Sequence, residues 1–339
     1  MFIVRPVKLS DAEDLFALSQ HYTFISLPSD KTIITKLIKS SLKAFEKASK
    51  NISEDTYIFV LEDLSKVKVI GCSMIHAQHG TVEEPHFFLK VSQENKFSES
   101  INTGFIHGTL KLGHDTNGPT EIGGLILDPN YRGNTHKLGK QLSFVRFLYM
   151  ALNKKKFKSV IHSELMPPFD KDGRSPLWEA IGRRFLNMEY TDADLLSRSN
   201  KEFILSLYPS DTIYETLLPI EARNSIGKVG EDTQPVKRML ESIGFKYTRE
   251  VDPFDGGPHY RANLVDIKPV DEMSECLLVF NKDIEKKDCK NYLVSLIEGR
   301  SFEVIKVLGI MEKGKLTTFQ KEQPDYSFVT NCKINAIPL

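Results

Sequence analysis

The sequence predicts an α+β fold: a mixed central sheet flanked by helices, an elaborated second half and a small β-rich C-terminal region. Strand and helix patterns alternate through the first half, and a strand, turn, helix and strand follow one another over residues 121–165. Beyond residue 271 the chain contains strand-like segments. We therefore expect three regions, at residues 1–165, 166–270 and 271–339, the second of which completes the core and forms the acceptor site.

The first part of the chain reads as a strand, two helices and a hairpin. Ser10 and Asp11 are helix-capping residue types, and the apolar residues of segment 31–45 recur along one helix face. A polar turn at 62–66 separates two β-rich segments, which predicts a hairpin. The expected elements are a strand at 3–7, a helix after Asp11, a helix at 31–45, strands at 57–61 and 67–75, and weaker strands near 87–91 and 105–112.

The middle of the chain predicts a parallel crossover unit. A strand at 121–127 ends at an Asp-Pro pair, and an Arg-Gly turn leads into an apolar helix at about 137–152. A strand at 159–165 completes the unit, and a Ser-Pro pair opens a helix near residue 175. The remaining elements are a polar, irregular stretch at 190–230, a helix at 235–243, a strand at 245–251 and tail strands at 277–280, 292–296 and 302–308.

The composition excludes several functional classes. Lys+Arg 45 balances Asp+Glu 45, so the chain lacks the net positive charge of a general nucleic-acid binder. The four cysteines are widely spaced with no CxxC pair, which predicts neither a disulfide framework nor a zinc knuckle. No apolar run approaches the ~20 residues of a membrane span, and the N-terminal residues lack a signal-peptide pattern. We expect a cytoplasmic protein that binds neither nucleic acid nor membrane.

Residues 121–142, EIGGLILDPNYRGNTHKLGKQL, carry the most informative motif. The turn leaves backbone N–H groups unpaired at a helix N-terminus, where a pyrophosphate or another anion is stabilised. Arg132, Lys137 and Lys140 add positive charge there, and the preceding strand offers main-chain groups to an extended pantetheine arm. A plain glycine-containing turn is the alternative interpretation.

The order of these elements resembles the GNAT acyltransferase superfamily, in which this turn cradles the pyrophosphate of acyl-CoA. The superfamily prefers a shorter Arg-x-x-Gly-x-Gly turn, whereas here two residues are added and Lys137 stands where glycine is common. The resemblance implies an acyl-CoA-binding core at residues 1–165. The cofactor-binding residues that it implies are Leu125, Ile126, Leu127, Arg132, Gly133, Gly139 and Lys140.

Further segments are typical of one acyltransferase family. They are Ile25-Ser26-Leu27-Pro28, YIFVLED at 57–63, TEIGGLILDPNYR at 120–132, SPLWEAIGRRFLNMEY at 175–190, LESIGFKY at 240–247 and FDGGP at 254–258. Over nearly its whole length the chain thus resembles the arginine N-succinyltransferase family. The resemblance implies transfer of a succinyl group from succinyl-CoA to the α-amino group of arginine, which opens a route of arginine degradation. The family's succinyl-CoA contact falls on Leu125.

The chain departs from that family at two places. Where the family typically reads Ile-Gly-x-Val-His-Pro, with the histidine as proposed proton donor, this chain has Gly230 and then Glu231. After the strand at 159–165 it has Met166-Pro167-Pro168, where the family tends to have a basic and a small residue. Two alternatives therefore stay open: a non-catalytic acyl-CoA-binding subunit or regulator, and an acyltransferase with another amine acceptor. Both a homo- and a hetero-oligomer are compatible with the sequence.

Two glutamates are candidates for acid–base chemistry. An α-amino group has a pKa of about 8, so orientation and oxyanion donors carry much of the acceleration. Glu121 heads the strand expected to line the thioester and is the candidate base, directly or through a water; a solvent-facing strand end is the alternative. Glu231, beside the vacant histidine position, is a weaker substitute for the missing group.

Guanidinium recognition requires carboxylates placed for bidentate contact. Asp255 in FDGGP and Glu164 at a strand end are the candidates; an Asx turn and a surface ion pair are the respective alternatives. Trp178 is expected in the core. No histidine, His136 and His162 included, has a partner at metal-ligand spacing, so no metal site is expected.

Overall fold

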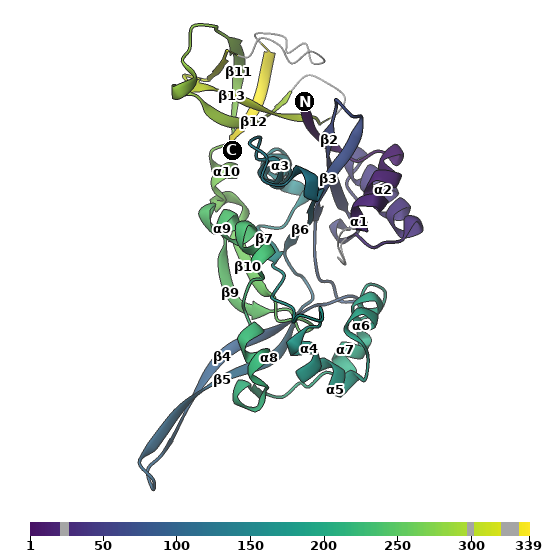
Figure 1. Ribbon diagram of the computed structural model, residues 1–339, viewed down its shortest axis with the longest axis vertical. Helices are drawn as coiled ribbons and strands as arrows, with labels where there is room; N and C mark the ends of the chain where they lie inside the picture. Colours follow the sequence, from purple (N-terminus) through teal and green to yellow (C-terminus); the bar gives the residue numbers. More distant parts are fainter. Residues whose placement is uncertain (21–26, 297–301, 320–331) are drawn as a thin grey trace. The chain divides into compact units, whose positions relative to one another are not determined.

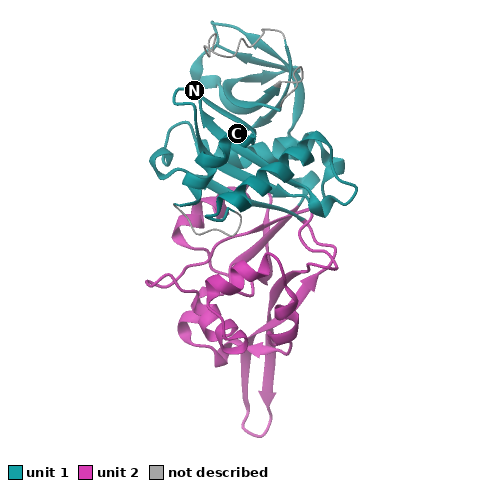
Figure 2. Cartoon of the chain, turned by 90° about the vertical axis from the view of Figure 1, so that its right-hand side faces the viewer, with its two compact units in different colours: residues 1–77, 120–159, 263–339 teal, residues 78–119, 160–262 magenta. Residues whose placement is uncertain are grey.

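The structure is a computed structural model that describes residues 1–20, 27–296, 302–319 and 332–339. The chain divides into two compact units (Figure 2). Unit 1 consists of residues 1–77, 120–159 and 263–339, and unit 2 of residues 78–119 and 160–262. The boundaries expected after residues 165 and 270 do not coincide with this division, because segment 78–119 contains a strand that pairs with a strand near residue 250.

Unit 1 contains an antiparallel sheet from the first 127 residues of the chain. Its strands are, in spatial order, β1 (Phe2–Pro6), β2 (Thr56–Asp63), β3 (Lys68–His76) and β6 (Thr120–Leu127). Figure 1 shows α1 (Ala12–Ser19) and α2 (Lys31–Glu46) over one face and α3 (Leu138–Leu152) over the other. These elements confirm the predicted strands, helices and hairpin to within a few residues at each end.

The core of this part of unit 1 follows from the apolar spacing of the helices. Asp30 starts α2 by accepting the backbone N–H groups of Thr32 and Ile33 at 2.7 and 2.9 Å. Ile34 and Ile38 then lie on the buried face and pack with strands of the sheet. Burying each such side chain contributes about 1.5–3 kcal/mol to folding.

The C-terminal strands form a small barrel in unit 1. They are β11 (Ser274–Phe280), β12 (Lys290–Leu296), β13 (Val304–Glu312), β14 (Lys315–Thr318) and β15 (Cys332–Pro338), preceded by α10 (Lys268–Asp271). Their order is β12-β15-β11-β14-β13, and β12 also pairs with β13, which closes the ring. Leu278, Leu316 and Ile334 are buried inside it. The predicted β-rich region is confirmed, and β14 and β15 add to the strands predicted there.

Unit 2 contains a second set of paired strands. In spatial order these are β7 (Val160–Glu164), β10 (Pro258–Asn263), β9 (Lys246–Val251), β4 (His86–Ser98), β5 (Thr103–Asp115) and β8 (Ile213–Tyr214). β4 and β5 form a long hairpin that projects beyond the rest of the unit (Figure 2). The strands predicted near 87–91 and 105–112 are parts of it. The outer half of β4 was missed because most of its residues are polar, whereas β5 was predicted over most of its length.

Residues 190–230, expected to be irregular, form short helices instead. The helices of unit 2 are α4 (Pro176–Ala180), α5 (Gly182–Leu186), α6 (Tyr190–Ser197), α7 (Glu202–Leu207), α8 (Ile220–Ser225) and α9 (Gln234–Ser242). Ala193, Ile204 and Ala222 share a buried core with Trp178, which confirms the predicted place of that residue. The prediction for 190–230 was wrong because helices of six to eight residues show too few turns for a periodic pattern. Among the described helices, none combines the length and hydropathy that a bilayer span requires.

Candidate active site

The glycine-containing turn predicted to bind a pyrophosphate connects β6 to α3. Asp128 starts it by accepting the backbone N–H of Asn130 at 2.9 Å. Gly133 has φ of +67°, a left-handed conformation that favours glycine, and Lys137 has φ of 56° directly before the helix. These two reversals turn the chain from the strand into α3.

The N-terminus of α3 leaves backbone donors for a ligand. The N–H groups of Lys140 and Gln141 both bond to the carbonyl of Lys137, at 3.0 and 3.1 Å. The preceding N–H groups, of Leu138 and Gly139, have no acceptor within the helix. A Cβ on Gly139 would meet a single side-chain atom, at 4.0 Å. An anion can therefore approach this backbone closely.

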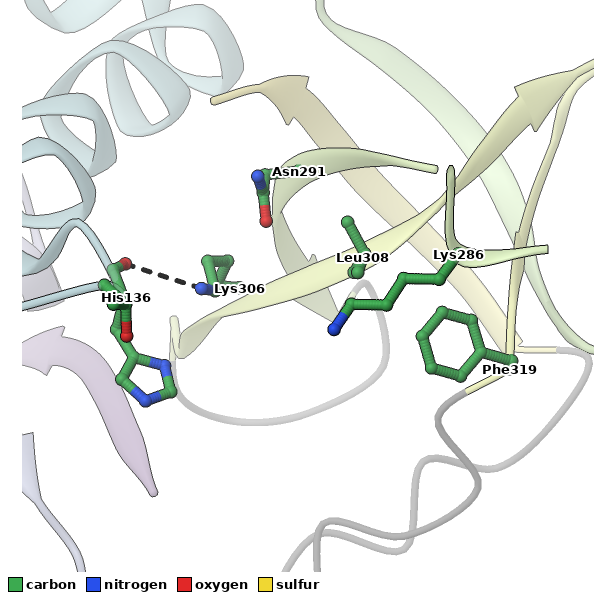
Figure 3. A pocket seen from close by; sticks show the side chains of 7 residues that line it. His136, Lys286, Asn291, Lys306, Leu308 and Phe319 are labelled. Atoms are coloured by element: carbon green, nitrogen blue, oxygen red, sulfur yellow. Dashed lines mark hydrogen bonds between the residues drawn. The ribbon is translucent and has the colours of Figure 1, made fainter. Parts of the chain in front are cut away.

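A pocket of about 390 Å³ adjoins the turn in unit 1 (Figure 3). It is lined by Thr135, His136, Lys286, Asn291, Lys306, Leu308 and Phe319. The Lys306 ammonium lies 3.5 Å from the carbonyl oxygen of His136, and burial together with Lys137 lowers its pKa. Burial and nearby lysines also lower the pKa of Lys140. Cations that repel one another around a turn are stabilised when phosphate groups bind there.

The strand before the turn carries a β-bulge. The pairing register with β3 shifts between Cys72 and Met74, so Gly124 and Leu125 of β6 together lie opposite one β3 residue. Gly124 has φ of +55°, and Leu125 is half-buried. A bulge interrupts the ladder of strand hydrogen bonds and frees backbone groups for an extended ligand. Leu125, the residue singled out from the sequence, lies in this bulge.

Arg146 of α3 donates a hydrogen bond to the strand next to the bulge. This contact was not predicted from the sequence. The Arg146 side chain is 2% exposed, and Nη1 donates to the carbonyl of Gly123 at 3.2 Å. Nη2 donates to the Ser143 hydroxyl at 2.7 Å, and Nε to the Ser143 carbonyl at 3.0 Å. Burial lowers the pKa of this guanidinium to about 9, so it stays charged at neutral pH. An arginine within an apolar helix segment was the one available signal.

The two candidate acid–base glutamates lie in different units. Glu121 is half-buried at the start of β6, opposite His76 in the strand register. An extended strand rises about 3.3 Å per residue, so four residues place Glu121 about 13 Å from Leu125. Glu121 is therefore out of direct contact with Leu125, and its role as the base stays a prediction. Glu231 begins a 3-10 turn, Glu231–Thr233, and is exposed.

Four carboxylates gather in unit 2. Glu164 ends β7, Asp194 lies in α6, and Asp252 and Asp255 lie between β9 and β10. Asp252 accepts the N–H groups of the two residues Phe254 and Asp255, at 2.7 and 3.1 Å. Asp255 accepts a backbone N–H two residues further on, at 2.7 Å. The predicted pair Glu164 and Asp255 is thus brought together, and Asp194 and Asp252 were missed.

Burial and mutual repulsion raise the pKa values of this carboxylate cluster. Burial raises the pKa of Asp194 to about 7, opposed by Arg198 and reinforced by Glu164. Burial, then Asp255 and then Glu164, raises the pKa of Asp252 well above its ordinary value. Burial and the charges of Glu164 and Asp194 raise the pKa of Asp255, against a backbone N–H that lowers it. A cation bound among these groups would relieve their repulsion.

Glu164 also faces three histidines, His86, His162 and His259, which are at most 1% exposed. Its Oε1 lies 3.3 Å from Nε2 of His162, 3.6 Å from Nε2 of His259 and 3.7 Å from Nδ1 of His86. Burial lowers the pKa of His86 strongly and that of His259 to about 3, so both rings are neutral. The expectation that no histidine has a metal-ligand partner rested on sequence spacing. It missed this group because the three histidines come from three separate strands.

The two segments that depart from the family pattern, around Gly230 and at Met166-Pro167-Pro168, contact each other. The N–H of Gly230 donates to the carbonyl of Met166 at 2.9 Å, and a Cβ at position 230 would meet the carbonyl oxygen of Pro167 at 2.9 Å. A histidine at this position therefore requires the backbone to move. The backbone of Met166 and Pro167 thus lies against Gly230, where the family has its histidine side chain.

The predicted cofactor-binding residues follow one continuous path through unit 1. Leu125, Ile126 and Leu127 lie on β6, Arg132 and Gly133 in the turn, and Gly139 and Lys140 in the first turn of α3. Their roles in binding stay predictions, as do those of Glu121, Glu231, Glu164 and Asp255. Ile25 and Ser26, from one of the segments that carry the resemblance, lie outside the described residues.

Comparison with known proteins identifies relatives over most of the chain. The family model described as "Arginine N-succinyltransferase beta subunit" matches residues 2–269. The arginine N-succinyltransferase of Yersinia pseudotuberculosis serotype O:3 (strain YPIII) is 36% identical over 292 residues, which cover 85% of this chain and 82% of that protein. The enzyme of the same name from Escherichia coli O6:K15:H31 is 32% identical over 275 residues, 80% of this chain and 78% of that one.

One solved structure matches the whole fold. Subunit AI of the arginine/ornithine succinyltransferase from Pseudomonas aeruginosa superposes with a TM-score of 0.82 at 25% identity and covers 100% of this chain and 98% of that one. The α+β fold predicted from the sequence is thereby confirmed. The match of the family model and the relatives above 30% identity support the same assignment. This chain belongs to the arginine N-succinyltransferase family.

Proposed function

We propose that this chain transfers the succinyl group of succinyl-CoA to the α-amino group of L-arginine. Besides the family assignment, the observation that carries the proposal is the carboxylate cluster of Glu164, Asp194, Asp252 and Asp255. Repelling, partly buried carboxylates are poised to bind a cation, and a guanidinium offers them planar, bidentate hydrogen bonds. Arginine is thus an acceptor that fits the charge of unit 2.

The donor side of the reaction is assigned to unit 1. The N–H groups at the start of α3, with Arg132 and Lys140, would hold the pyrophosphate of the CoA moiety. Lys286 and Lys306 of the adjoining pocket would contact a further phosphate. The pantetheine arm would follow β6 to the bulge, where Leu125 would contact the succinyl thioester. Arg146 would position that bulge by holding the carbonyl of Gly123.

The chemistry needs few protein groups. The neutral α-amine forms a bond to the thioester carbon, the carbonyl oxygen becomes an oxyanion, and its collapse breaks the carbon–sulfur bond. Backbone N–H groups freed at the bulge would stabilise the oxyanion. Glu121 would accept the amine proton through a chain of waters, and the CoA thiolate would take up a proton in the last step. Glu231 is retained as a second candidate for that proton exchange.

The test is release of free thiol from succinyl-CoA, with acetyl-CoA alongside, in the presence and absence of arginine. We expect release that depends on arginine and favours succinyl-CoA. Glu121→Gln should lower kcat by about 10²–10⁴-fold. Asp170→Asn is the matched control, because Asp170 is an exposed carboxylate that accepts backbone N–H groups in a loop. Bound CoA without thiol release would instead support the non-catalytic alternative, and release with another amine would support a different acceptor.

We also propose that the chain works within an oligomer in the cytoplasm. The matched family model and the Pseudomonas structure are both described as subunits. The tip of the β4–β5 hairpin exposes Phe97, Ile101, Phe105 and Ile106, each more than 60% accessible. Exposed apolar side chains in one place are typical of a contact surface. Light scattering after size-exclusion chromatography measures the assembly, and Phe105→Ser should shift it toward the monomer.

A further inference from the structure

We propose that His86, His162, His259 and Glu164 bind one divalent transition-metal ion, with Zn²⁺ as the ion that this ligand set favours. Each residue offers one donor atom, and the four donor atoms lie within 4.8 Å of one another. They come from the start of β4, from β7 and from β10, so a bound ion would join three strands of unit 2. The proposal shares Glu164 with the carboxylate cluster proposed to bind arginine, but its test measures ion binding and does not depend on succinyl transfer.

Glu164 forms a hydrogen bond with Nε2 of His162, and its contacts with His259 and His86 are longer than hydrogen bonds. Glu164 Oε1 lies 3.3, 3.6 and 3.7 Å from the three imidazole nitrogens. Hydrogen bonds from nitrogen to oxygen are about 2.7–3.2 Å long. Zinc bonds of about 2.0–2.1 Å place neighbouring ligand atoms of a tetrahedron about 3.3–3.4 Å apart. The four donor atoms lie up to 4.8 Å apart, so the side chains must draw inward to about 3.4 Å to form one coordination shell.

Unsatisfied nitrogen atoms point to a missing partner. Neither ring nitrogen of His259 has a hydrogen-bond partner among the described residues, and the side chain is 0% exposed. Nε2 of His86 is also buried without a partner, but Nδ1 is the His86 atom that faces Glu164, so Nε2 of His259 is the unpartnered nitrogen directed at the proposed ion. A neutral imidazole presents one lone pair, and leaving a buried acceptor unsatisfied costs about 1–3 kcal/mol. An ion at the centre of the cluster would accept the lone pairs that face Glu164.

His162 can join the site only by giving up another contact. Arg261 Nε lies 3.3 Å from its Nδ1, which favours a ring proton on Nε2 in the metal-free protein. Coordination through Nε2 moves that proton to Nδ1, so the contact with Arg261 must break. Arg261 keeps ionic partners, since Nη2 lies 3.1 Å from Glu250 and 3.7 Å from Asp115. Those two carboxylates also offset the positive charge beside the proposed ion.

The ligand chemistry selects the class of ion. Three imidazoles and one carboxylate suit zinc and neighbouring transition metals, whereas Mg²⁺ and Ca²⁺ prefer shells of oxygen. Four protein ligands close a tetrahedral site, which is typical of a structural ion. Such an ion would hold Oε1 of Glu164 in place and would add positive charge next to the carboxylate cluster.

The test is a zinc titration of the full chain after treatment with a chelator, read by competition with a chromophoric chelator. We expect one Zn²⁺ per chain, and Co²⁺ in its place should give the intense visible absorption of a tetrahedral complex. His259→Ala and His86→Ala should weaken binding by at least about 100-fold. His107→Ala is the matched control, because His107 lies on β5 outside the cluster and should leave binding unchanged.

Glu164→Gln distinguishes a loss of ion binding from a loss of folding, because it keeps the size of the side chain and removes only its charge. Zn²⁺ should raise the Tm of the starting protein and of His107→Ala, and should raise that of Glu164→Gln much less. Absence of a tightly bound ion would overturn the proposal. So would zinc binding of equal strength in His86→Ala, His259→Ala and Glu164→Gln, since the ion would then lie elsewhere.

Discussion

The donor turn of unit 1 and the Glu164 site of unit 2 are built in opposite ways. The turn comes from one continuous segment, residues 120–140, and offers backbone N–H groups and partly exposed cations. The Glu164 site draws carboxylates and histidines from segments far apart in the chain. Its histidines are buried and its carboxylates are half-buried. Backbone donors survive side-chain changes, whereas a buried charge is lost with a single substitution. The two sites should therefore respond very differently to mutation.

The largest effect is expected at the carboxylate cluster. Asp255→Asn keeps an oxygen to accept the N–H of Gly257 and removes one charge that a guanidinium would pair with. Removing one partner of a buried charged contact costs about 2–5 kcal/mol, so kcat/KM for arginine should fall by at least about 30-fold. Steady-state kinetics at saturating succinyl-CoA measure this loss.

Asp255→Asn should not weaken the binding of CoA. The affinity of the Asp255→Asn variant for CoA, measured by calorimetry, should match that of the starting protein. Asp170→Asn, the exposed counterpart, should leave both quantities unchanged. If Asp255→Asn alters CoA affinity and the KM for arginine equally, the carboxylate acts on the fold and not on the acceptor.

Arginine binding should weaken as the pH falls through about 7. Burial raises the pKa of Asp194 to about 7, opposed by Arg198 and reinforced by Glu164, so below that pH the empty site holds a proton. Bound guanidinium must displace it, and the affinity should fall about 10-fold between pH 8 and pH 6. Calorimetry in two buffers of different ionisation enthalpy detects the released proton, and Asp194→Asn should abolish most of the pH dependence.

The same pKa shift predicts the sign of a stability change. In the unfolded chain the Asp194 carboxyl ionises near its ordinary pKa of about 4, whereas in the folded chain it stays protonated up to about 7. The unfolded state thus binds fewer protons between these values, so this group's contribution to the unfolding free energy decreases as the pH rises from about 4 to 7. Without arginine, Asp194→Asn should therefore raise the Tm at pH 8. An unchanged or lower Tm would mean that Asp194 is well solvated or paired.

A smaller effect is expected at the donor turn. Arg132→Ala removes one exposed cation while the N–H groups of Leu138 and Gly139 remain, so CoA affinity should fall by about 5- to 10-fold. Part of this loss should disappear at high salt, because exposed charges are screened. Lys171→Ala removes an equivalent exposed charge in unit 2 and should have no effect on CoA. A loss above 100-fold would mean that side chains, and not the backbone, carry donor binding.

This contrast also explains what the sequence could predict. Arg132, Gly133 and Gly139 could be predicted as binding residues because all the parts of the turn lie within a few residues of one another. Asp194 and Arg146 were missed, because a lone carboxylate on a short helix and a lone arginine on an apolar one carry no local pattern. The histidine cluster was missed for the same reason. Its residues lie on β7, β10 and β4 of one sheet, with β9 between the last two, and strands distant in sequence leave no periodic pattern.

A last comparison takes one glycine from each unit and applies the same substitution to both. At Gly230 a Cβ would meet the Pro167 carbonyl oxygen at 2.9 Å. The hydrogen bond from the Gly230 N–H to the Met166 carbonyl holds the two backbone segments together, so neither can easily move away. Gly230→Ala should therefore lower the unfolding free energy by about 1–3 kcal/mol. At Gly139 a Cβ has room, so Gly139→Ala should be neutral or should stabilise α3 by up to about 1 kcal/mol. Urea unfolding measures both changes.

If Gly230→Ala is tolerated as well as Gly139→Ala, the backbone near Pro167 can move to accept a side chain. Close packing is then not the reason why the family's histidine is absent at position 230. Gly230→His would then be expected to fold normally, and its thiol release would show directly whether the family's histidine adds to the rate in this chain.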